Sequence, residues 1–460
     1  MTAVTRQLAD VLAAITYADL PPQAVRETHR AVLDWLGSAL AGAVETPARL
    51  TQRVVTRLGS SKEATVFGAG RASAAVAALA NGVASHILEF DDVHKGSTLH
   101  GAAPIIPAAL AVAEREHADG RAFIAAVAVG YEAALRIGEA VNPSHYRFWH
   151  PTGTVSTFGA AAAASSLMRL TGDEMVQALG SAGTQAAGLW EFNADGAMSK
   201  HLHAGKAAFN GVLSADLSRA GFSGATRILE GDRGFFRAFS TAHDATRITD
   251  GLGTTWKISE NCYKLHSCCG HTHTPIDVAL DIRAERNWSA ADVLANVAEI
   301  WIEMYGPGYA IVKDMNPCTP YQAKFSIAYC VATGLLEGRV ELEQFSPERF
   351  ARDGVQDVPI ATLLRRTRVT IADDLTRKYP SAWPARLTLT LKYRSVVHGT
   401  SDYPKGHPEN PVSTEQLEEK FRVLVGSRFG CDTVNRGLRA VHALDSCGDV
   451  ARLFHDLLPT

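Results

Sequence analysis

The chain has 460 residues, of which 46% are hydrophobic and 20% charged. This is an ordinary globular composition, and the length predicts two or three domains. The formal net charge of −3 at pH 7 excludes a basic field for nucleic acid and a polybasic membrane patch. Charges interrupt the first 17 residues and the apolar stretch 123–141, so we expect neither a signal peptide nor a transmembrane span. Seven cysteines, an odd number unevenly placed, indicate reduced thiols and a cytoplasmic protein.

Helical periodicity dominates the first 250 residues. Ala-rich segments carry apolar residues at helical spacing, and Gly, Pro or a polar capping residue bounds each segment. These segments predict helices at about 24–40, 72–88, 103–116, 121–140, 154–170, 174–187 and 203–221.

The pattern changes after about residue 260. Alternating apolar residues predict strands at 297–304, 368–371 and 386–397, and helices are expected at 323–336, at 345–352 and from Thr414 onward. The sequence therefore predicts a mainly α protein. A large helical domain, 1–265, would be completed by 410–460, and a smaller α+β lid domain, 266–409, would be inserted into it.

Three acidic residues and two histidines lie close together in the segment EFDDVHKGSTLHG, residues 89–101. A carboxylate beside a histidine can tune that histidine as a general base, and loops between helices often carry catalytic groups. The alternative is a helix end followed by capping acids. The candidate residues of this segment are Glu89, Asp91, Asp92, His94 and His100.

Two further segments place polar groups at predicted helix starts. HPTGTVSTFGAAAAA, residues 150–164, begins with His150, and DGAMSKHLHAGKAA, residues 195–208, contains Lys200, His201, His203 and Lys206. Helix N-termini with nearby cations attract carboxylates. The alternatives are a buried Ala-rich core helix for the first segment and a solvated face for the second.

Cysteines and histidines crowd the segment NCYKLHSCCGHTHTPID, residues 261–277. Their spacing does not match a tetrahedral zinc pattern, so we expect no metal, although a metalloenzyme stays an alternative. Lys264 is a candidate carboxylate ligand or base. An inter-domain linker with buried thiols is the other interpretation.

One segment imitates a dinucleotide-binding fingerprint. VFGAGRAS, residues 66–73, resembles the start of G-x-G-x-x-G, and Glu89 follows about twenty residues later. An NAD-dependent dehydrogenase is thus an alternative. Helices rather than a β-α-β unit are expected next, so we interpret the segment as a turn feeding a helix.

Together these segments resemble the MmgE/PrpD family, whose activities include 2-methylcitrate dehydratase, cis-aconitate decarboxylase and iminodisuccinate epimerase. Matching segments occur in the expected order at 66–94, 130–138, 150–164, 195–211, 221–236, 264–277, 320–329 and 403–421. The chain departs from the family pattern at Cys269, where the decarboxylases have histidine, and at Gly101-Ala102, where the family has Pro-Gly after the histidine.

The resemblance implies a homodimer that acts on a small di- or tricarboxylate without a cofactor. Cofactor-free dehydration of a 2-methylcitrate-like hydroxy acid is the expected reaction, with epimerisation or decarboxylation as alternatives. The catalytic residues that it implies are Asp91, Asp92, His100, His150, Lys200 and Lys264. The substrate-binding residues are Glu89, His94, His203, Cys269, His273 and Tyr309.

Overall fold

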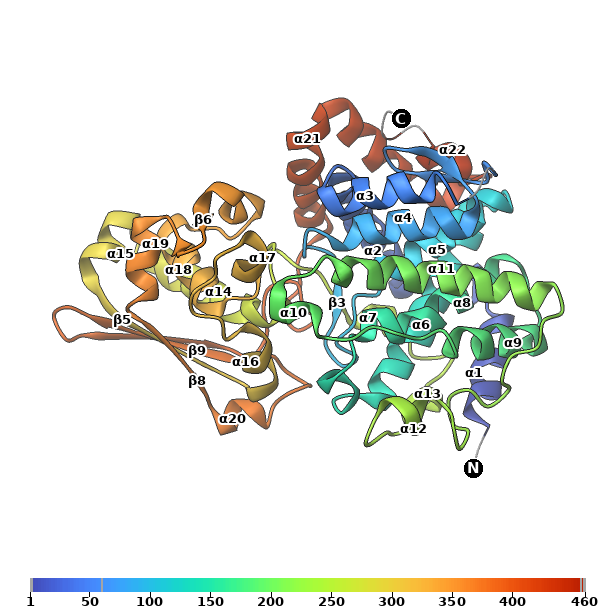
Figure 1. Ribbon diagram of the computed structural model, residues 1–460, viewed down its shortest axis with the longest axis horizontal. Coiled ribbons are helices and arrows are strands. Elements are labelled where there is room, and N and C mark those ends of the chain that lie inside the picture. The colour runs from blue at the N-terminus through green and yellow to red at the C-terminus, as the bar shows by residue number, and fades with distance from the viewer. Residues whose placement is uncertain (1–2, 59–60, 456, 458–460) are drawn as a thin grey trace. The chain divides into compact units, whose positions relative to one another are not determined.

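The computed structural model describes residues 3–58, 61–455 and 457 and is drawn in Figure 1. The chain forms two compact units. Unit 1 contains the chain up to Ile87, Asp91–Asn261 and the chain from Ser413 onward, and unit 2 contains Leu88–Phe90 and Cys262–Val412. Helices make up most of the structure, which confirms the predicted mainly α fold.

Unit 1 is a helical bundle with one small hairpin. Its helices are α1 (Val4–Ala14), α2 (Pro22–Gly42), α3 (Thr46–Val55), α4 (Ala74–His86), α5 (Ala102–Arg115), α6 (Gly120–Val141), α7 (Pro151–Thr154), α8 (Ser156–Leu167), α9 (Gly172–Gly183), α10 (Phe192–Asp195), α11 (Ser199–Arg219), α12 (Phe235–Phe239), α13 (Thr246–Thr249), α21 (Thr414–His442) and α22 (Ala451–Phe454). Figure 1 shows α4 and α11 running side by side, and these two helices contact each other extensively.

Small residues set the spacing between the central helices. Helix α8 contains a run of five alanines and is buried along nearly its whole length. A Cβ atom added to Gly82 of α4 would lie 2.8 Å from the Cα of Gly205 in α11. The two backbones therefore touch where neither residue has a side chain, and this contact fixes which residues one turn away face each other.

The long helix α21 packs against α2 in the same unit. The Nζ of Lys420 lies 2.6 Å from the Oδ1 of Asp34, and both side chains are buried. Phe421 lies over Gly37, where an added Cβ would approach the phenyl ring to 3.1 Å. A buried ion pair and an apolar contact thus join segments from opposite ends of the sequence.

Unit 2 is built on a four-stranded sheet of order β10-β9-β5-β8. Strand β5 (Val297–Met304) pairs in parallel with β8 (Thr367–Ile371) and antiparallel with β9 (Ala385–Leu391), which pairs antiparallel with β10 (Val396–Ser401). Alternate residues of β5 and β9 are buried, and the helices that contact the sheet include α14 and α18. The helices of this unit are α14 (His273–Glu285), α15 (Ala290–Asn296), α16 (Gly306–Val312), α17 (Pro320–Lys324), α18 (Ile327–Glu337), α19 (Val358–Leu364) and α20 (Asp373–Thr376).

Two sequence predictions in unit 2 are wrong. The segment 386–397 is not one strand, because the chain turns after Leu391 and Arg394 adopts a left-handed φ of 64° between β9 and β10. The segment 345–352 is not a helix. Two 3₁₀ turns, Leu342–Phe345 and Pro347–Arg349, precede the short strand β6 (Phe350–Ala351), which pairs with β7 (Gly354–Val355). Pro347 has no N–H with which to continue a helix from the first turn.

The glycine-rich segment 66–73 forms a hairpin. Strands β1 (Ala64–Val66) and β2 (Gly70–Ala72) are antiparallel neighbours, and Gly68 and Gly70 adopt left-handed φ angles of 77° and 86°. Helix α4 follows at Ala74. A dinucleotide fingerprint needs a strand followed directly by a helix and a parallel strand, so the hairpin disagrees with the dehydrogenase alternative.

None of the helices in the described part of the chain is long and apolar enough to span a bilayer. None of the seven cysteines, all of which lie in the described part of the chain, belongs to a disulfide.

Candidate active site

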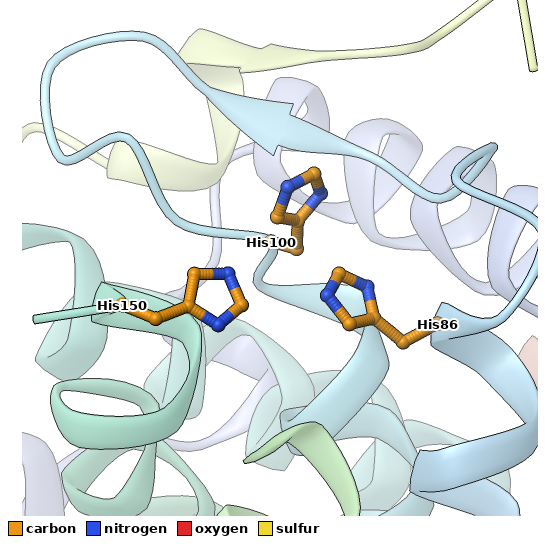
Figure 2. Close-up of side chains that lie close together, drawn as sticks. All are labelled: His86, His100 and His150. Carbon is orange, nitrogen blue, oxygen red and sulfur yellow. The ribbon is translucent and has the colours of Figure 1, made fainter. Parts of the chain in front are cut away.

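Three histidines from separate segments of unit 1 converge, as Figure 2 shows. His86 is the last residue of α4, His100 follows the short strand β3 (Val93–His94), and His150 precedes α7. One ring nitrogen from each lies within 4.8 Å of the others. His86 and His150 are buried, whereas the side chain of His100 is 12% exposed.

The close contact between α4 and α11 brings His86 into this cluster. His86 lies one helical turn after Gly82, and His201 lies one turn before Gly205. Residues four apart share a helix face, so the two histidine rings meet, with centroids 6.3 Å apart. The glycine contact therefore places a histidine of α4 beside the first turn of α11.

The loop that carries His100 is fastened to three helices. The backbone N–H of His100 donates to the Oγ1 of Thr152 in α7 at 3.1 Å. Asp92 accepts from the N–H of Ala102 at the start of α5 and from the hydroxyl of Tyr131 in α6, at 3.0 Å and 2.5 Å. These bonds hold the loop in one position and explain why a polar segment is buried.

Asp91 is shared by two histidines. Its Oδ2 lies 2.7 Å from the Nδ1 of His86 and 3.4 Å from the Nδ1 of His100. The Nδ1 of His100 also donates to the carbonyl oxygen of Asp92 at 2.6 Å. Because these partners are acceptors, both histidines carry a proton on Nδ1, and a proton that either ring transfers would pass through its Nε2. A carboxylate that fixes the tautomer of an imidazole in this way prepares it as a general base.

The carboxyl group of Asp92 is not part of that arrangement. Burial raises its pKa to about 7, nearby Asp91 adds to the rise, and the Tyr131 hydroxyl opposes it. Asp92 contacts His100 through its backbone carbonyl oxygen. The Asp92 side chain thus bonds to Ala102 and Tyr131, which hold the loop, rather than to a ring of the histidine cluster.

Lys200, His150 and His203 form another side of the cluster, in which Lys200 is the cation. The Nδ1 atoms of His150 and His203 are 3.1 Å apart, and Lys200 is buried on the first turn of α11. Burial holds the pKa of His150 well below its usual range, and the charges of His203 and Lys200 lower it further. Burial likewise lowers the pKa of His203 to about 4. Lys200 supplies the positive charge here, and an anion bound beside it would favour protonation of both histidines, so this side of the cluster suits a carboxylate.

Unit 2 brings Glu89 and Lys264 together. The Nζ of Lys264 donates to the carbonyl oxygen of Glu89 at 3.1 Å and lies 3.8 Å from its carboxylate, and both side chains are 1% exposed. Ser267 and Lys324 donate to the carbonyl oxygen of the adjacent Leu88. Glu89 adopts a left-handed φ of 57°, which is uncommon for a residue with a side chain. Bonds on both sides thus hold a strained residue next to a buried lysine.

The remaining predicted residues of unit 2 are spread over three elements. The N–H of Cys269 donates to the carbonyl oxygen of Lys324. His273 begins α14, and burial lowers its pKa. Tyr309 is half-buried on α16. No hydrogen bond or ring contact described for this unit joins Tyr309 to Cys269 or His273.

His94 joins a different cluster in unit 1. Its Nδ1 lies 2.8 Å from the hydroxyl of Ser97, and its Nε2 lies 3.5 Å and 3.8 Å from carboxylate oxygens of Glu260 and Glu139. Lys257 pairs with both glutamates. The predicted role of His94 in substrate binding thus lacks a contact to the His86, His100 and His150 rings among the interactions described.

Two groups of three side chains in the described residues could hold a metal ion: His86, His100 and His150, and His94, Glu139 and Glu260. The Cys262–His273 segment supplies neither. The charge of Lys200 beside the first group and of Lys257 in the second disfavours a cation at either place.

Sequence reasoning missed His86. The sequence feature that could have revealed His86 is its position at the end of a predicted helix, five residues before Asp91. The residues that the structure does bring together from the prediction are Asp91, His100, His150, Lys200 and His203 in unit 1, and Glu89 with Lys264 in unit 2.

Imidazoles oriented by a buried carboxylate beside a buried ammonium group are typical of enzymes that move protons on anionic substrates. The chain belongs to the MmgE/PrpD family. The MmgE/PrpD N-terminal domain matches residues 6–248, and the MmgE/PrpD C-terminal domain matches 266–446. This confirms the resemblance seen in the sequence.

Curated relatives match nearly the whole chain. The cis-aconitate decarboxylase-like protein oryM of Aspergillus oryzae is 27% identical, covering 98% of this chain and 96% of its own length. The cis-aconitate decarboxylases of Aspergillus terreus and Homo sapiens are each 26% identical, covering 98% of this chain and 95% and 94% of their own lengths.

Proposed function

We propose that the chain is a lyase of small di- or tricarboxylates that stabilises a carbanion beside a carboxylate. The observation that carries this proposal is the Asp91 carboxylate shared by His86 and His100, close to buried Lys200. A proton next to a carboxylate is very weakly acidic, so its removal needs preorganised positive charge where negative charge develops. Lys200 supplies that charge, and the Nε2 of His100 or His150 transfers the proton.

Decarboxylation of a cis-aconitate-like acid is the first candidate reaction, because the relatives named above are called cis-aconitate decarboxylases. The bond to the leaving carboxyl carbon breaks and carbon dioxide departs. The electron pair of the broken bond forms a new double bond, and the electron pair of the original double bond moves to the carbon beside a remaining carboxylate. The imidazolium group of His100 then protonates that carbon.

Dehydration of a 2-methylcitrate-like hydroxy acid, expected from the sequence, needs the same groups. A neutral imidazole takes the proton beside the carboxylate, the electron pair forms the double bond, and the hydroxyl leaves as water after protonation. Return of the proton to the opposite face would instead give epimerisation. The carbanion is common to all three reactions, so the substrate decides among them.

A substrate screen tests the proposal. Purified full-length protein is incubated with cis-aconitate, citrate and 2-methylcitrate, and proton NMR and carbon dioxide release are followed. We expect carbon dioxide and a new methylene alkene from cis-aconitate. Water loss from 2-methylcitrate without carbon dioxide would assign a dehydratase instead. No change in any of these acids or their stereoisomers would contradict the proposal.

The proposed chemistry uses only the chain's own cations and imidazoles. Turnover should therefore survive dialysis against a chelator, measured with the best substrate of the screen. A loss of activity that added metal restores would contradict this part of the proposal. The homodimer and the cytoplasmic location stay predictions, and light scattering of the purified protein tests the first.

Lys264 is proposed to bind a substrate carboxylate. Lys264→Met should lower kcat/KM by about 10²-fold, because a charge-assisted hydrogen bond contributes about 1.5–3 kcal/mol. The variant also removes the ammonium group beside the buried Glu89 carboxylate, which costs about 3–5 kcal/mol of stability. The double variant Lys264→Met/Glu89→Gln separates the two effects, since it should recover melting temperature without recovering turnover. Lys405→Met, which breaks an exposed ion pair with Asp281, is the control.

A further inference from the structure

One buried nitrogen of the histidine cluster has no hydrogen-bond partner. His86 is fully buried, and its Nδ1 bonds to Asp91 at 2.7 Å, but its Nε2 meets no donor or acceptor among the described residues. Leaving such a group unpaired costs about 1–3 kcal/mol. Buried polar atoms are nearly always paired, so this nitrogen requires an explanation.

The surroundings of His86 point to an external partner. Its ring lies 5.7 Å from that of His150, nearly parallel to it, and 4.8 Å from that of His100. Figure 2 shows the rings of His86 and His150 side by side, with His100 above them. The same neighbourhood contains Lys200, whose charge acts on His150. A group that approaches the Nε2 of His86 would thus enter a cationic environment, which favours an anion.

We infer that His86 is a further substrate-binding residue of the proposed active site and donates from Nε2 to a substrate carboxylate. This inference rests on the proposed function. Since Nδ1 already carries the proton shared with Asp91, Nε2 must gain a second proton from solvent before it can donate. His86 then becomes an imidazolium between two carboxylates, that of Asp91 and that of the ligand.

Two substitutions separate direct binding from an effect through Asp91. In His86→Asn the amide nitrogen occupies the place of Nδ1, so the bond to Asp91 is kept and the group at Nε2 is lost. In His86→Gln the amide reaches towards Nε2, and the bond to Asp91 is lost. The probe is propane-1,2,3-tricarboxylate, which has neither a hydroxyl to eliminate nor a double bond. Its binding to the full-length protein is measured by calorimetry.

Direct binding predicts that His86→Asn weakens affinity by about 10- to 100-fold, the range of one charge-assisted hydrogen bond, and that His86→Gln weakens it less. The reverse order, or wild-type affinity in folded His86→Asn, would overturn the inference and leave His86 a support for Asp91. Circular dichroism and melting temperature establish that each variant is folded.

Proton uptake gives a second readout, which a purely structural role would not change. Calorimetry at pH 7.5 in buffers of different ionisation enthalpy reports the protons taken up on binding. We expect the wild-type protein to take up about one proton more than His86→Asn. Equal uptake by the two proteins would contradict the inference.

The same experiments keep the inference distinct from the proposed function. A wild-type protein that binds the tricarboxylate and turns over none of the screened acids refutes the lyase but leaves the binding role of His86 measurable. Active enzyme whose His86→Asn variant binds normally refutes only the inference. A wild-type protein without affinity for any tricarboxylate refutes the inference whatever the screen shows.

Discussion

Lys200→Met should lower kcat/KM by about 10³-fold while the protein stays folded. Lys200 is buried on the first turn of α11, and its charge acts on both His150 and His203. Removing one preorganised group that stabilises developing negative charge typically costs about 10²–10³ in rate, and a full charge beside a buried carbanion belongs at the upper end. Steady-state kinetics with the best substrate of the screen measures the loss.

Lys206→Met is the matched control for this variant. Lys206 lies six residues further along α11, is half-buried, and donates from Nζ to the carbonyl oxygen of Gln185. Lys206→Met removes the same charge from the same helix. A general loss of electrostatic potential or of helix stability would therefore lower the activity of both variants alike. Equal losses in the two variants would remove Lys200 from the proposed mechanism.

Asp91→Asn should lower kcat by about 10³-fold or more, although asparagine has nearly the same size and shape as aspartate. The Oδ2 of Asp91 accepts from the Nδ1 of His86 and lies 3.4 Å from the Nδ1 of His100, whereas an amide offers a single acceptor and brings its own donor. Replacing a carboxylate that fixes the tautomer of a catalytic imidazole has effects of about 10⁴ in the serine-protease triad. Because His86 and His100 both contact the Oδ2 of Asp91, Asp91→Asn should lower kcat more than a substitution that removes the contact of one histidine ring alone.

The neighbouring Asp92→Asn tests whether the two adjacent carboxyl groups differ in role. Asp92 contacts His100 through its backbone carbonyl, which the substitution keeps, and its side chain bonds to Tyr131 and to the N–H of Ala102. We therefore expect a loss of turnover much smaller than that of Asp91→Asn. A larger loss for Asp92→Asn, measured side by side at pH 7.5, would reverse the assignment.

Local patterns predicted most of the helices and two strands, 297–304 and 368–371, well. The strand Val297–Met304 has the predicted bounds, because alternate burial on one face of a sheet leaves a direct trace in the residue order. The hairpin at 385–401 was missed, since alternation continues across the turn and only the left-handed Arg394 reveals the reversal. The alternation of apolar residues therefore reveals that a strand is present but not where the chain turns back.

The candidate site was predicted in part for a related reason. Asp91, His100, His150 and Lys200 stand in polar segments that interrupt apolar helices, so each could be found by itself. His86 belongs to a helix and looks like a residue of its last turn. What brings it to His201 is a contact between Gly82 and Gly205, residues that pair only in three dimensions.

The pairing of α2 with α21 has a consequence for biosynthesis. Asp34 leaves the ribosome long before its partner Lys420, which follows 386 residues later in the sequence. Until then Lys420 is not available to Asp34, and the apolar face of α2 that α21 covers in the folded protein is exposed. Fragments that stop short of the last helices should accumulate as insoluble material or stay bound to chaperones, so expression of this protein in pieces will succeed only when both ends are supplied together.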